Sequence, residues 1–406
     1  MRQNKFFLLL LGALSAAFFS SVLAAQERNS WPEDCRVGMF LHFLPGGESA
    51  DRMQKEFQVE QLADQIVQAG ADYFVLTMYQ NSGWFNAPSP VYDEITGYKA
   101  GERCSDRDIV MEMADAMARR GIKFFVYLTA QVPNRDERAQ AAFGLETGPR
   151  DQKLSFEFAR KWAEVFRDWS LRYGTKVSGW WVDGCYAWCG FDDEIAAIYR
   201  DALLAGNPDA VVAFNPGVLK PEWNASDFTA GEITEPFEEK IAGSKNDRGQ
   251  KKHILTYLGN FWSDGKVRFP TDEWLAWAIP AVDAGLALTI DLGLVTGDGT
   301  LGPGEFLPEG IKQIRAITDA VRGYTAEDEF RRTIEYDWLR QEIAAGRTFE
   351  SPDALAALCA RTEALLEKLR DEEYIAPEAA DALADAVGAA RGEDPNALAP
   401  EEVKAR

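Results

Sequence analysis

Short apolar stretches alternate with amphipathic stretches from residue 37 to about residue 322, and this alternation predicts strands followed by helices. The apolar runs are continuous, as in parallel strands that are covered on both faces. Eight strands are predicted at 37–43, 72–79, 123–129, 179–183, 210–215, 225–232, 254–262 and 286–293. Apolar residues at helical spacing predict helices at 59–69, 105–120, 154–173, 193–205, 272–284 and 308–322.

Eight strands that alternate with helices predict an α/β protein, a (β/α)8 TIM barrel that occupies residues 31–323. The alternative is an open doubly wound sheet, which would need a glycine-rich phosphate loop after the first strand. The sequence there, Phe43-Leu44-Pro45-Gly46-Gly47, lacks the spacing of that loop. Ser105 or Asp106 is expected to cap the second helix.

The composition changes after Gly323 to one rich in Ala, Glu, Leu and Arg. Proline and glycine separate three helical stretches, which predict a helical extension at 324–391 and a flexible tail at 392–406. The leucine stripe that includes Leu355, Leu358 and Leu365 is expected to pack against the barrel or against the extension itself. An alternative is a dimerisation arm, which would make the protein a homo-oligomer.

Residues 1–25 are predicted to be a secretory signal peptide. Arg2 and Lys5 precede an apolar stretch from Phe6 to Phe19, and small residues end at Ala25. That stretch is too short for a good membrane span, and no later one reaches roughly 18 apolar residues. We therefore expect an exported protein, periplasmic or extracellular, without a transmembrane segment.

Acidic residues outnumber basic ones, 65 to 43, which gives a formal charge of −22. A surface of this sign repels nucleic acid and anionic membranes, whose phosphates require basic partners. A neutral sugar remains compatible with it.

Polar and aromatic residues follow the predicted strands, and the carboxyl ends of barrel strands form the active-site face. The residues at these ends are His42, Gln80, Asn81, Tyr127, Thr129, Asp183, Asn215, Glu232, Asn260, Trp262 and Asp291. Amides and carboxylates bind hydroxyl groups, while tryptophans cover the apolar face of a sugar ring. The predicted substrate-binding residues are His42, Gln80, Asn81, Trp84, Tyr127, Trp181, Asn215 and Trp262, and Trp188 is a further aromatic candidate. The set predicts a hydroxyl-rich ligand, an oligosaccharide or glycoconjugate.

Asp183 ends the apolar run Gly179-Trp180-Trp181-Val182 and precedes Gly184. An Asp-Gly pair alone is more often a turn. Together with Glu232, however, Asp183 supplies the two carboxylates that glycoside hydrolysis needs, one as nucleophile or base and one as proton donor.

Other chemistries lack their sequence signals. There is no Gly-x-Ser-x-Gly for a serine hydrolase and no glycine loop for a nicotinamide cofactor. His42 and His253 do not accompany Cys185 and Cys189 in a ligand cluster, so we expect neither a metal nor a cofactor. The two cysteines are close enough to form a disulfide after export.

Several segments together resemble glycoside hydrolase family 29, the retaining α-L-fucosidases, over residues 31–321. The matching segments are Val37-Gly38-Met39-Phe40-Leu41-His42-Phe43, Ala71-Asp72-Tyr73-Phe74-Val75-Leu76-Thr77, Gly83-Trp84-Phe85, Ser105-Asp106-Arg107-Asp108-Ile109-Val110, Trp181-Val182-Asp183-Gly184 and Ala284-Gly285-Leu286-Ala287-Leu288-Thr289-Ile290. The resemblance implies that Asp183 is the nucleophile, that His42 and Trp181 line the sugar pocket, and that Glu232 is the acid/base. Glu235 is the alternative acid.

The sequence departs from the family's pattern at three sugar-binding positions. Gln80-Asn81 stands where the family has two histidines, and Gly217 stands where it has an arginine. Both carboxylates are retained, so we expect a retaining exo-glycosidase for an α-L-fucoside or a related sugar. The alternatives are a catalytically silent carbohydrate-binding barrel and a structural protein organised by its helical extension.

Overall fold

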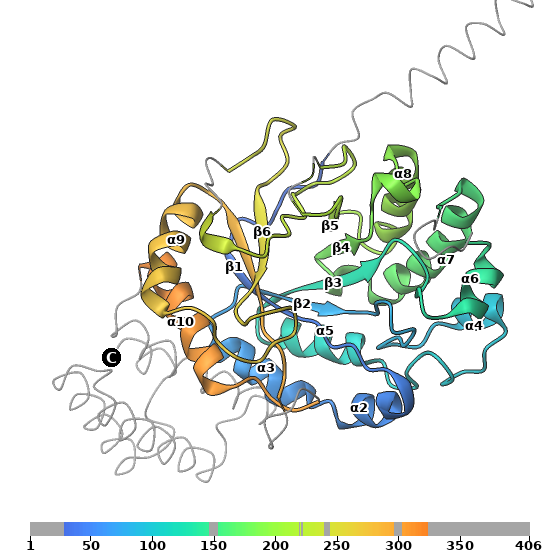
Figure 1. Cartoon of the computed structure of the whole chain (residues 1–406), viewed down its shortest axis with the longest axis horizontal. Helices are drawn as coiled ribbons and strands as arrows, with labels where there is room; N and C mark the ends of the chain where they lie inside the picture. The colour runs from blue at the N-terminus through green and yellow to red at the C-terminus, as the bar shows by residue number, and fades with distance from the viewer. Residues whose placement is uncertain are drawn as a thin grey trace, which may run out of the picture. The chain divides into compact units, whose positions relative to one another are not determined.

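A parallel sheet of short buried strands stands at the centre of the structure (Figure 1). The computed structural model describes residues 28–145, 153–218, 220, 222–238, 244–295 and 303–323. The strands are β1 (Val37–Leu41), β2 (Tyr73–Thr77), β3 (Lys123–Thr129), β4 (Gly179–Asp183), β5 (Val211–Phe214), β6 (His253–Tyr257) and β7 (Ala287–Asp291). Nearly all their residues are buried, so the interpretation of continuous apolar runs as strands covered on both faces is confirmed.

The strands lie in the order β5-β4-β3-β2-β1-β7-β6, and every neighbouring pair is parallel. β1, the first strand, pairs with β2 on one side and with β7, the last strand, on the other. Gly38 lies opposite Tyr73 of β2, and Val37 lies opposite Leu288 of β7. The sheet therefore curls towards closure. Between β5 and β6 there is one place without a regular strand.

Residues 226–233 occupy that place. On one side the backbone N–H of Asp227 donates to Val212 O of β5 at 2.8 Å, and on the other side Leu255 of β6 donates to Gly231 O at 2.9 Å. The regular strand predicted at 225–232 is wrong, because only isolated parallel bridges form there, at Phe228 and Glu232. Gly231 has a φ of +66°, which interrupts an extended strand. With this segment in the eighth place, the fold is a parallel α/β sheet consistent with a (β/α)8 barrel.

Helices cover the outer face of the sheet (Figure 1). They are α2 (Ala50–Glu56), α3 (Val59–Gln68), α4 (Pro90–Thr96), α5 (Ile109–Arg119), α6 (Glu137–Phe143), α7 (Phe156–Tyr173), α8 (Asp193–Leu203), α9 (Thr271–Asp283) and α10 (Pro308–Arg322). Short 3₁₀ helices are η1 (Gly47–Ser49), η2 (Gly174–Lys176), η3 (Ala187–Cys189) and η4 (Pro236–Glu238). The six predicted helices correspond to α3, α5, α7, α8, α9 and α10, whereas α2, α4 and α6 were not predicted.

The helix caps correct one detail of the sequence analysis. The N-cap of α5 is Asp108, whose side chain accepts from Met111 N, and not Ser105 or Asp106. Ser105 instead accepts a hydrogen bond from Arg107 N in the preceding turn. α7 begins as expected, with Ser155 accepting from Phe158 N.

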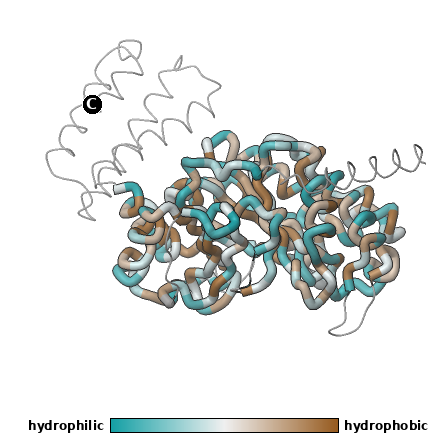
Figure 2. Tube along the Cα trace, turned by 90° about the horizontal axis from the view of Figure 1, so that it is seen from above, coloured by the Kyte–Doolittle hydropathy of each residue, from teal (hydrophilic) through white to brown (hydrophobic). Residues whose placement is uncertain are grey.

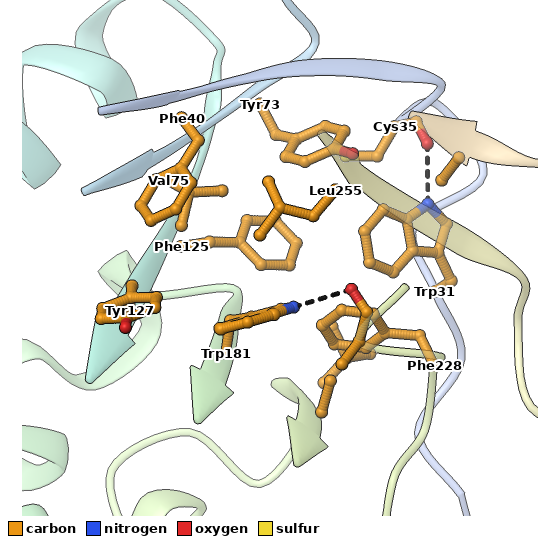
Figure 3. Packing of buried hydrophobic residues seen from close by; sticks show 14 residues of the cluster. Trp31, Cys35, Phe40, Tyr73, Val75, Phe125, Tyr127, Trp181, Phe228 and Leu255 are labelled. Carbon is orange, nitrogen blue, oxygen red and sulfur yellow. Dashed lines mark hydrogen bonds between the residues drawn. The ribbon is translucent and has the colours of Figure 1, made fainter. Parts of the chain in front are cut away.

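Aromatic side chains fill the inside of the barrel (Figure 3). Trp31 lies against Tyr73, Phe125 and Phe228, and its indole nitrogen donates to Cys35 O at 2.7 Å. A cavity of only about 10 Å³ remains among these side chains. The barrel interior is therefore a packed core with no room for a ligand among these side chains.

A buried ion pair joins α8 to the segment in the eighth place. Arg200 Nη1 lies 2.6 Å from Asp227 Oδ2, and both side chains are almost inaccessible to solvent. The same carboxylate accepts from Val212 N of β5 and from Asn29 N, both at 2.9 Å. Because a buried charge is tolerated only with such partners, this network holds the irregular segment against β5.

Hydrophobic residues gather along inner parts of the described trace, with hydrophilic residues at many of its outer turns (Figure 2). The chain divides into two compact units between Ile314 and Arg315, inside α10. Among the described residues, no helix has the length and apolar character that a membrane crossing needs. The predicted signal peptide at 1–25, helical extension at 324–391 and tail at 392–406 lie outside the described residues and stay predictions.

Candidate active site

Two carboxylates share one amide group at the carboxyl ends of the strands. Asp183 is the last residue of β4, and Asn215 directly follows β5. Asn215 Nδ2 donates to Asp183 Oδ1 at 2.8 Å and to Glu232 Oε2 at 2.7 Å. These two bonds limit the separation of the two carboxylate oxygens to at most about 5.5 Å. The structure therefore brings together three of the predicted residues from distant parts of the sequence.

Asp183 is surrounded by hydrogen-bond donors. Its Oδ2 accepts from the hydroxyl group of Tyr127 at 2.6 Å, and its Oδ1 also accepts from Gly184 N at 2.7 Å. Gln80 Nε2 donates to the same Tyr127 hydroxyl at 2.7 Å. Burial, followed by the negative charge of Asp183, raises the pKa of Tyr127 well above its usual value. Tyr127 is therefore a neutral donor that stabilises an ionised Asp183.

Glu232 has a different environment. Its side chain is largely buried, and burial raises the pKa of its carboxyl group above the usual value. The charge of Asp183 adds to this increase, while the hydrogen bond from Asn215 and the nearby His42 oppose it. Hydrogen-bond donors thus surround Asp183, whereas burial and a neighbouring negative charge bias Glu232 towards the protonated form.

His42 and Asp291 form a buried pair beside the carboxylates. His42 Nδ1 lies 3.0 Å from Asp291 Oδ1, at the end of β7. The other oxygen of Asp291 accepts from Ser263 N at 2.6 Å. Ser263 has a φ of +67°, a left-handed conformation that is rare for a serine, so the aspartate holds a strained turn next to Trp262.

The aromatic residues divide into two groups. Trp181 is buried in the barrel interior, where its indole nitrogen donates to Ala230 O at 3.0 Å and its ring stacks on Tyr127 (Figure 3). Trp262 is only partly buried and meets the ring of His42 edge to face at 5.4 Å. Trp181 thus packs against Tyr127 from the barrel core, and Trp262 lies beside His42 at the strand ends.

Five candidate residues lie outside this hydrogen-bonded set. Asn81 is exposed, and the Trp84 ring faces the guanidinium of Arg103 at 4.9 Å. Thr129 donates to Gln131 O, and Asn260 binds Asp264 within its own turn. Glu235, the alternative acid, is exposed and lies 3.3 Å from Arg268.

Sequence reasoning missed Tyr186 and Glu222. The negative charge of Asp183, followed by burial and the charge of Glu232, raises the pKa of Tyr186, which lies three residues after Asp183. Glu222 Oε1 accepts from Ala230 N at 3.1 Å, and burial raises the pKa of Glu222 to about 8. The aromatic run after Gly184 could have indicated Tyr186, whereas no spacing signal marks Glu222.

Cys185 and Cys189 do not form the disulfide that their spacing would allow. Cys185 and Cys189 are both free and buried, and Cys189 Sγ donates instead to Tyr186 O at 3.0 Å. Within the described ranges, no group of three or more His, Cys, Asp and Glu side chains is arranged to hold a metal ion.

Comparisons with known proteins agree with this geometry. A family model described as Alpha-L-fucosidase matches residues 50–254, about half of the chain. No curated protein sequence matches the chain significantly.

Solved structures of carbohydrate-active enzymes have a similar fold. The endo-fucoidan hydrolase MfFcnA4 from glycoside hydrolase family 107 is 14% identical with a TM-score of 0.56, and the match covers 73% of this chain and 53% of that one. The endo-fucoidan hydrolase P5AFcnA from the same family is 16% identical with a TM-score of 0.53, over 70% of this chain and 91% of that one. A family 29 α-L-fucosidase from Bacteroides thetaiotaomicron, a trapped covalent intermediate, is 16% identical with a TM-score of 0.52, over 74% of this chain and 77% of that one.

At these identities the likeness to solved structures shows the fold, and the match spans only about half the length of MfFcnA4. The family model adds the sequence evidence, because it covers β2 to β5 and reaches into β6, and with them Asp183, Asn215 and Glu232. The chain belongs to the alpha-L-fucosidase family.

Proposed function

We propose that the protein is an exported, retaining exo-glycosidase that hydrolyses an α-L-fucoside or a stereochemically related sugar. The observation that carries the proposal is the amide of Asn215 shared by Asp183 and Glu232. Retaining glycosidases hold their two carboxyl groups roughly 5–5.5 Å apart, which leaves no room for a water between carboxylate and sugar. The upper limit of about 5.5 Å set by the shared amide agrees with that spacing.

Asp183 is the nucleophile in this proposal. Its three donors, Tyr127, Asn215 and Gly184, fix its orientation. In the first step a carboxylate oxygen of Asp183 forms a bond to the anomeric carbon while the bond to the leaving oxygen breaks. Glu232 gives its proton to that oxygen, so the leaving group departs as a neutral alcohol.

Glu232 acts as the base in the second step. After losing its proton it accepts one from an incoming water, whose oxygen attacks the anomeric carbon as the bond to Asp183 breaks. The raised pKa of Glu232 suits a group that is protonated at the start of each cycle. Two inversions at the anomeric carbon give overall retention.

His42 and its neighbours are proposed to bind the sugar in the reacting position. When His42 Nδ1 donates to Asp291, Nε2 becomes an acceptor for a sugar hydroxyl group. Trp262 adds an aromatic surface beside it. The chain has Gln80 bonded to Tyr127 where the family resemblance implies a histidine, so we expect weaker hydrolysis of a simple aryl α-L-fucoside than of some other glycoside.

Proton NMR of the first product formed from 4-nitrophenyl α-L-fucopyranoside and a panel of aryl glycosides tests the proposal. An α-configured initial product from an α-fucoside supports retention, and a β-configured one contradicts it. Sugar binding without turnover of any glycoside would favour the carbohydrate-binding alternative.

Export rests on residues 1–25 alone. Expression of the full chain in a bacterial host, followed by mass spectrometry of the periplasmic fraction, should give a mature protein that lacks this segment. A protein that stays in the cytoplasm with the segment uncleaved would contradict export.

A further inference from the structure

The loop from Gly184 to Gly190 begins directly after Asp183 and carries an exposed aromatic pair. The rings of Tyr186 and Trp188 are stacked, with centroids 5.7 Å apart and planes at 17°. Trp188 is 61% exposed. A single exposed tryptophan needs no explanation, but this one belongs to a stack that reaches the catalytic carboxylates through Tyr186.

Tyr186 connects the exposed ring to the candidate active site. The charges of Asp183 and Glu232 both act on its hydroxyl group and raise its pKa. Its ring also packs on the loop after β5, where Tyr186 Cε1 lies 3.4 Å from the position that a Cβ would take on Gly217. A side chain at position 217 would therefore contact the ring of Tyr186.

Hydrogen bonds hold the loop in one conformation. Gln131 Nε2 donates to Gly184 O at 2.7 Å, and Trp223 Nε1 donates to Cys185 O at 2.8 Å. Cys189 Sγ donates to Tyr186 O at 3.0 Å, and Leu154 N donates to Cys189 O at 2.7 Å. The aromatic pair is therefore preorganised, and a ligand that stacks on it would not have to order the loop.

The pair and His42 follow different strands. His42 belongs to the end of β1 and contacts Trp262, whereas Tyr186 and Gly217 follow β4 and β5. β2 and β3 lie between β1 and β4 in the sheet, so the two groups lie apart at the strand ends. If the reacting sugar occupies the His42 side, the leaving group extends over the aromatic pair.

We propose that Tyr186 and Trp188 form a binding subsite for a neutral sugar ring on the leaving-group side of the scissile bond. This inference rests on the proposed function. The apolar face of a pyranose ring stacks on an indole, and the Tyr186 hydroxyl group can bind a hydroxyl group of the same ring. A neutral ring fits better than a sulfated or carboxylated one, because Asp192, Asp193 and Glu194 follow the loop at the start of α8. The substrate class is then an oligosaccharide or glycan, and a small aglycone would lack this contact.

Two substrates separate the subsite from the reaction itself. α-L-Fucosyl fluoride has no leaving-group ring, and fucosyllactose has a galactose or glucose ring there. Trp188→Ala should lower kcat/KM for fucosyllactose about tenfold more than for the fluoride, because a stacking contact is lost only with the disaccharide linkage. Trp188→Phe keeps an aromatic face and should retain most of the wild-type ratio. Leu171→Ala, at an equally exposed apolar residue on α7, should leave both values unchanged.

Each outcome decides the proposal. If wild-type protein hydrolyses both substrates and Trp188→Ala, folded by circular dichroism, changes them by the same factor, the subsite is wrong while the proposed function stands. If wild-type protein hydrolyses neither these two substrates nor any glycoside of the aryl panel, the proposed function fails, and the subsite fails with it. Equal losses in Trp188→Phe and Trp188→Ala would also contradict stacking.

Discussion

Asp183 and Glu232 reach the same amide group from two different kinds of backbone. Asp183 ends a regular strand in register with both neighbours, since Thr129 of β3 lies opposite it and Val182 lies opposite Phe214 of β5. Glu232 lies in a segment that forms only isolated bridges, and both backbone and side-chain hydrogen bonds hold this segment. A regular strand positions the nucleophile, and a set of individual hydrogen bonds positions the acid. Single substitutions far from the reacting atoms should therefore disturb Glu232 more readily than Asp183.

The largest effect is expected at Asp183, which ends the regular strand β4. Asp183→Gly should lower kcat by at least about 10⁴-fold on every substrate, because no other group can form the glycosyl bond. Azide should restore turnover by occupying the vacated space, and the product should be a glycosyl azide of inverted configuration. Near-normal activity in this variant, measured with an aryl glycoside, would contradict the assignment.

Glu232→Ala tests the proposed acid, which lies in the irregular segment. We expect a loss of about 10²–10⁴-fold for leaving groups that need a proton, and a much smaller one for a glycosyl fluoride. Glu235→Ala is the matched control, because Glu235 is exposed and faces Arg268. Collapse in Glu235→Ala together with normal rates in Glu232→Ala would move the acid three residues along the chain.

Asn215→Ala removes the link between the two carboxylates. We expect a loss of roughly ten- to a hundredfold in kcat/KM, as for other hydrogen bonds to charged groups. The hydrogen bond from Asn215 lowers the pKa of Glu232, so its loss should raise that pKa further and shift the basic limb of the pH profile to higher pH.

The control for this variant is Asn207→Ala, which removes a hydrogen bond to Val177 O away from the strand ends. It should leave the pH profile unchanged. A basic limb that stays in place in Asn215→Ala would show that the amide does not act on Glu232.

The smallest effect is expected at Glu222, and it concerns stability. Its folded pKa of about 8 lies above the usual 4.5, so between these pH values the folded protein binds more protons than the unfolded chain. Stability contributed by the protonated form is therefore lost as the pH rises through this window. Glu222→Gln cannot ionise, yet it can still accept from Ala230 N.

Thermal unfolding at several pH values between about 5 and 8 measures this effect. The melting temperature of Glu222→Gln relative to wild type should rise by a few degrees as the pH increases. Parallel curves for the two proteins would show that Glu222 does not hold a proton in the folded state.

The strand that carries Asp183 could be predicted from the sequence, whereas the conformation of the segment that carries Glu232 could not. The apolar run before Asp183 indicates a buried strand, and strand ends meet at one face of a barrel, so His42, Tyr127 and Asn215 were expected near it. Trp181 lies two residues before Asp183 and shares its face of the strand, which explains why it is one layer deeper, in the core.

Hydrophobic periodicity does not predict the conformation of the segment at 225–232. Its conformation depends on Gly231, on the buried pair of Asp227 with Arg200, and on the acceptor that Glu222 offers to Ala230 N. These are contacts between residues that no local spacing connects. The sequence analysis expected Glu232 at a strand end, but the contacts that hold it there could not be predicted, and Glu222 was missed.

The most direct test of the central claim is to trap the glycosyl-enzyme. Incubation with 2-deoxy-2-fluoro-α-L-fucosyl fluoride, followed by proteolysis and mass spectrometry, should locate one fluorofucosyl group on the peptide that contains Asp183. Glu232→Ala should accumulate the same adduct, because fluoride departs without a proton and only the second step needs the base. An adduct on another carboxylate, or turnover with inversion and no adduct, would contradict the account.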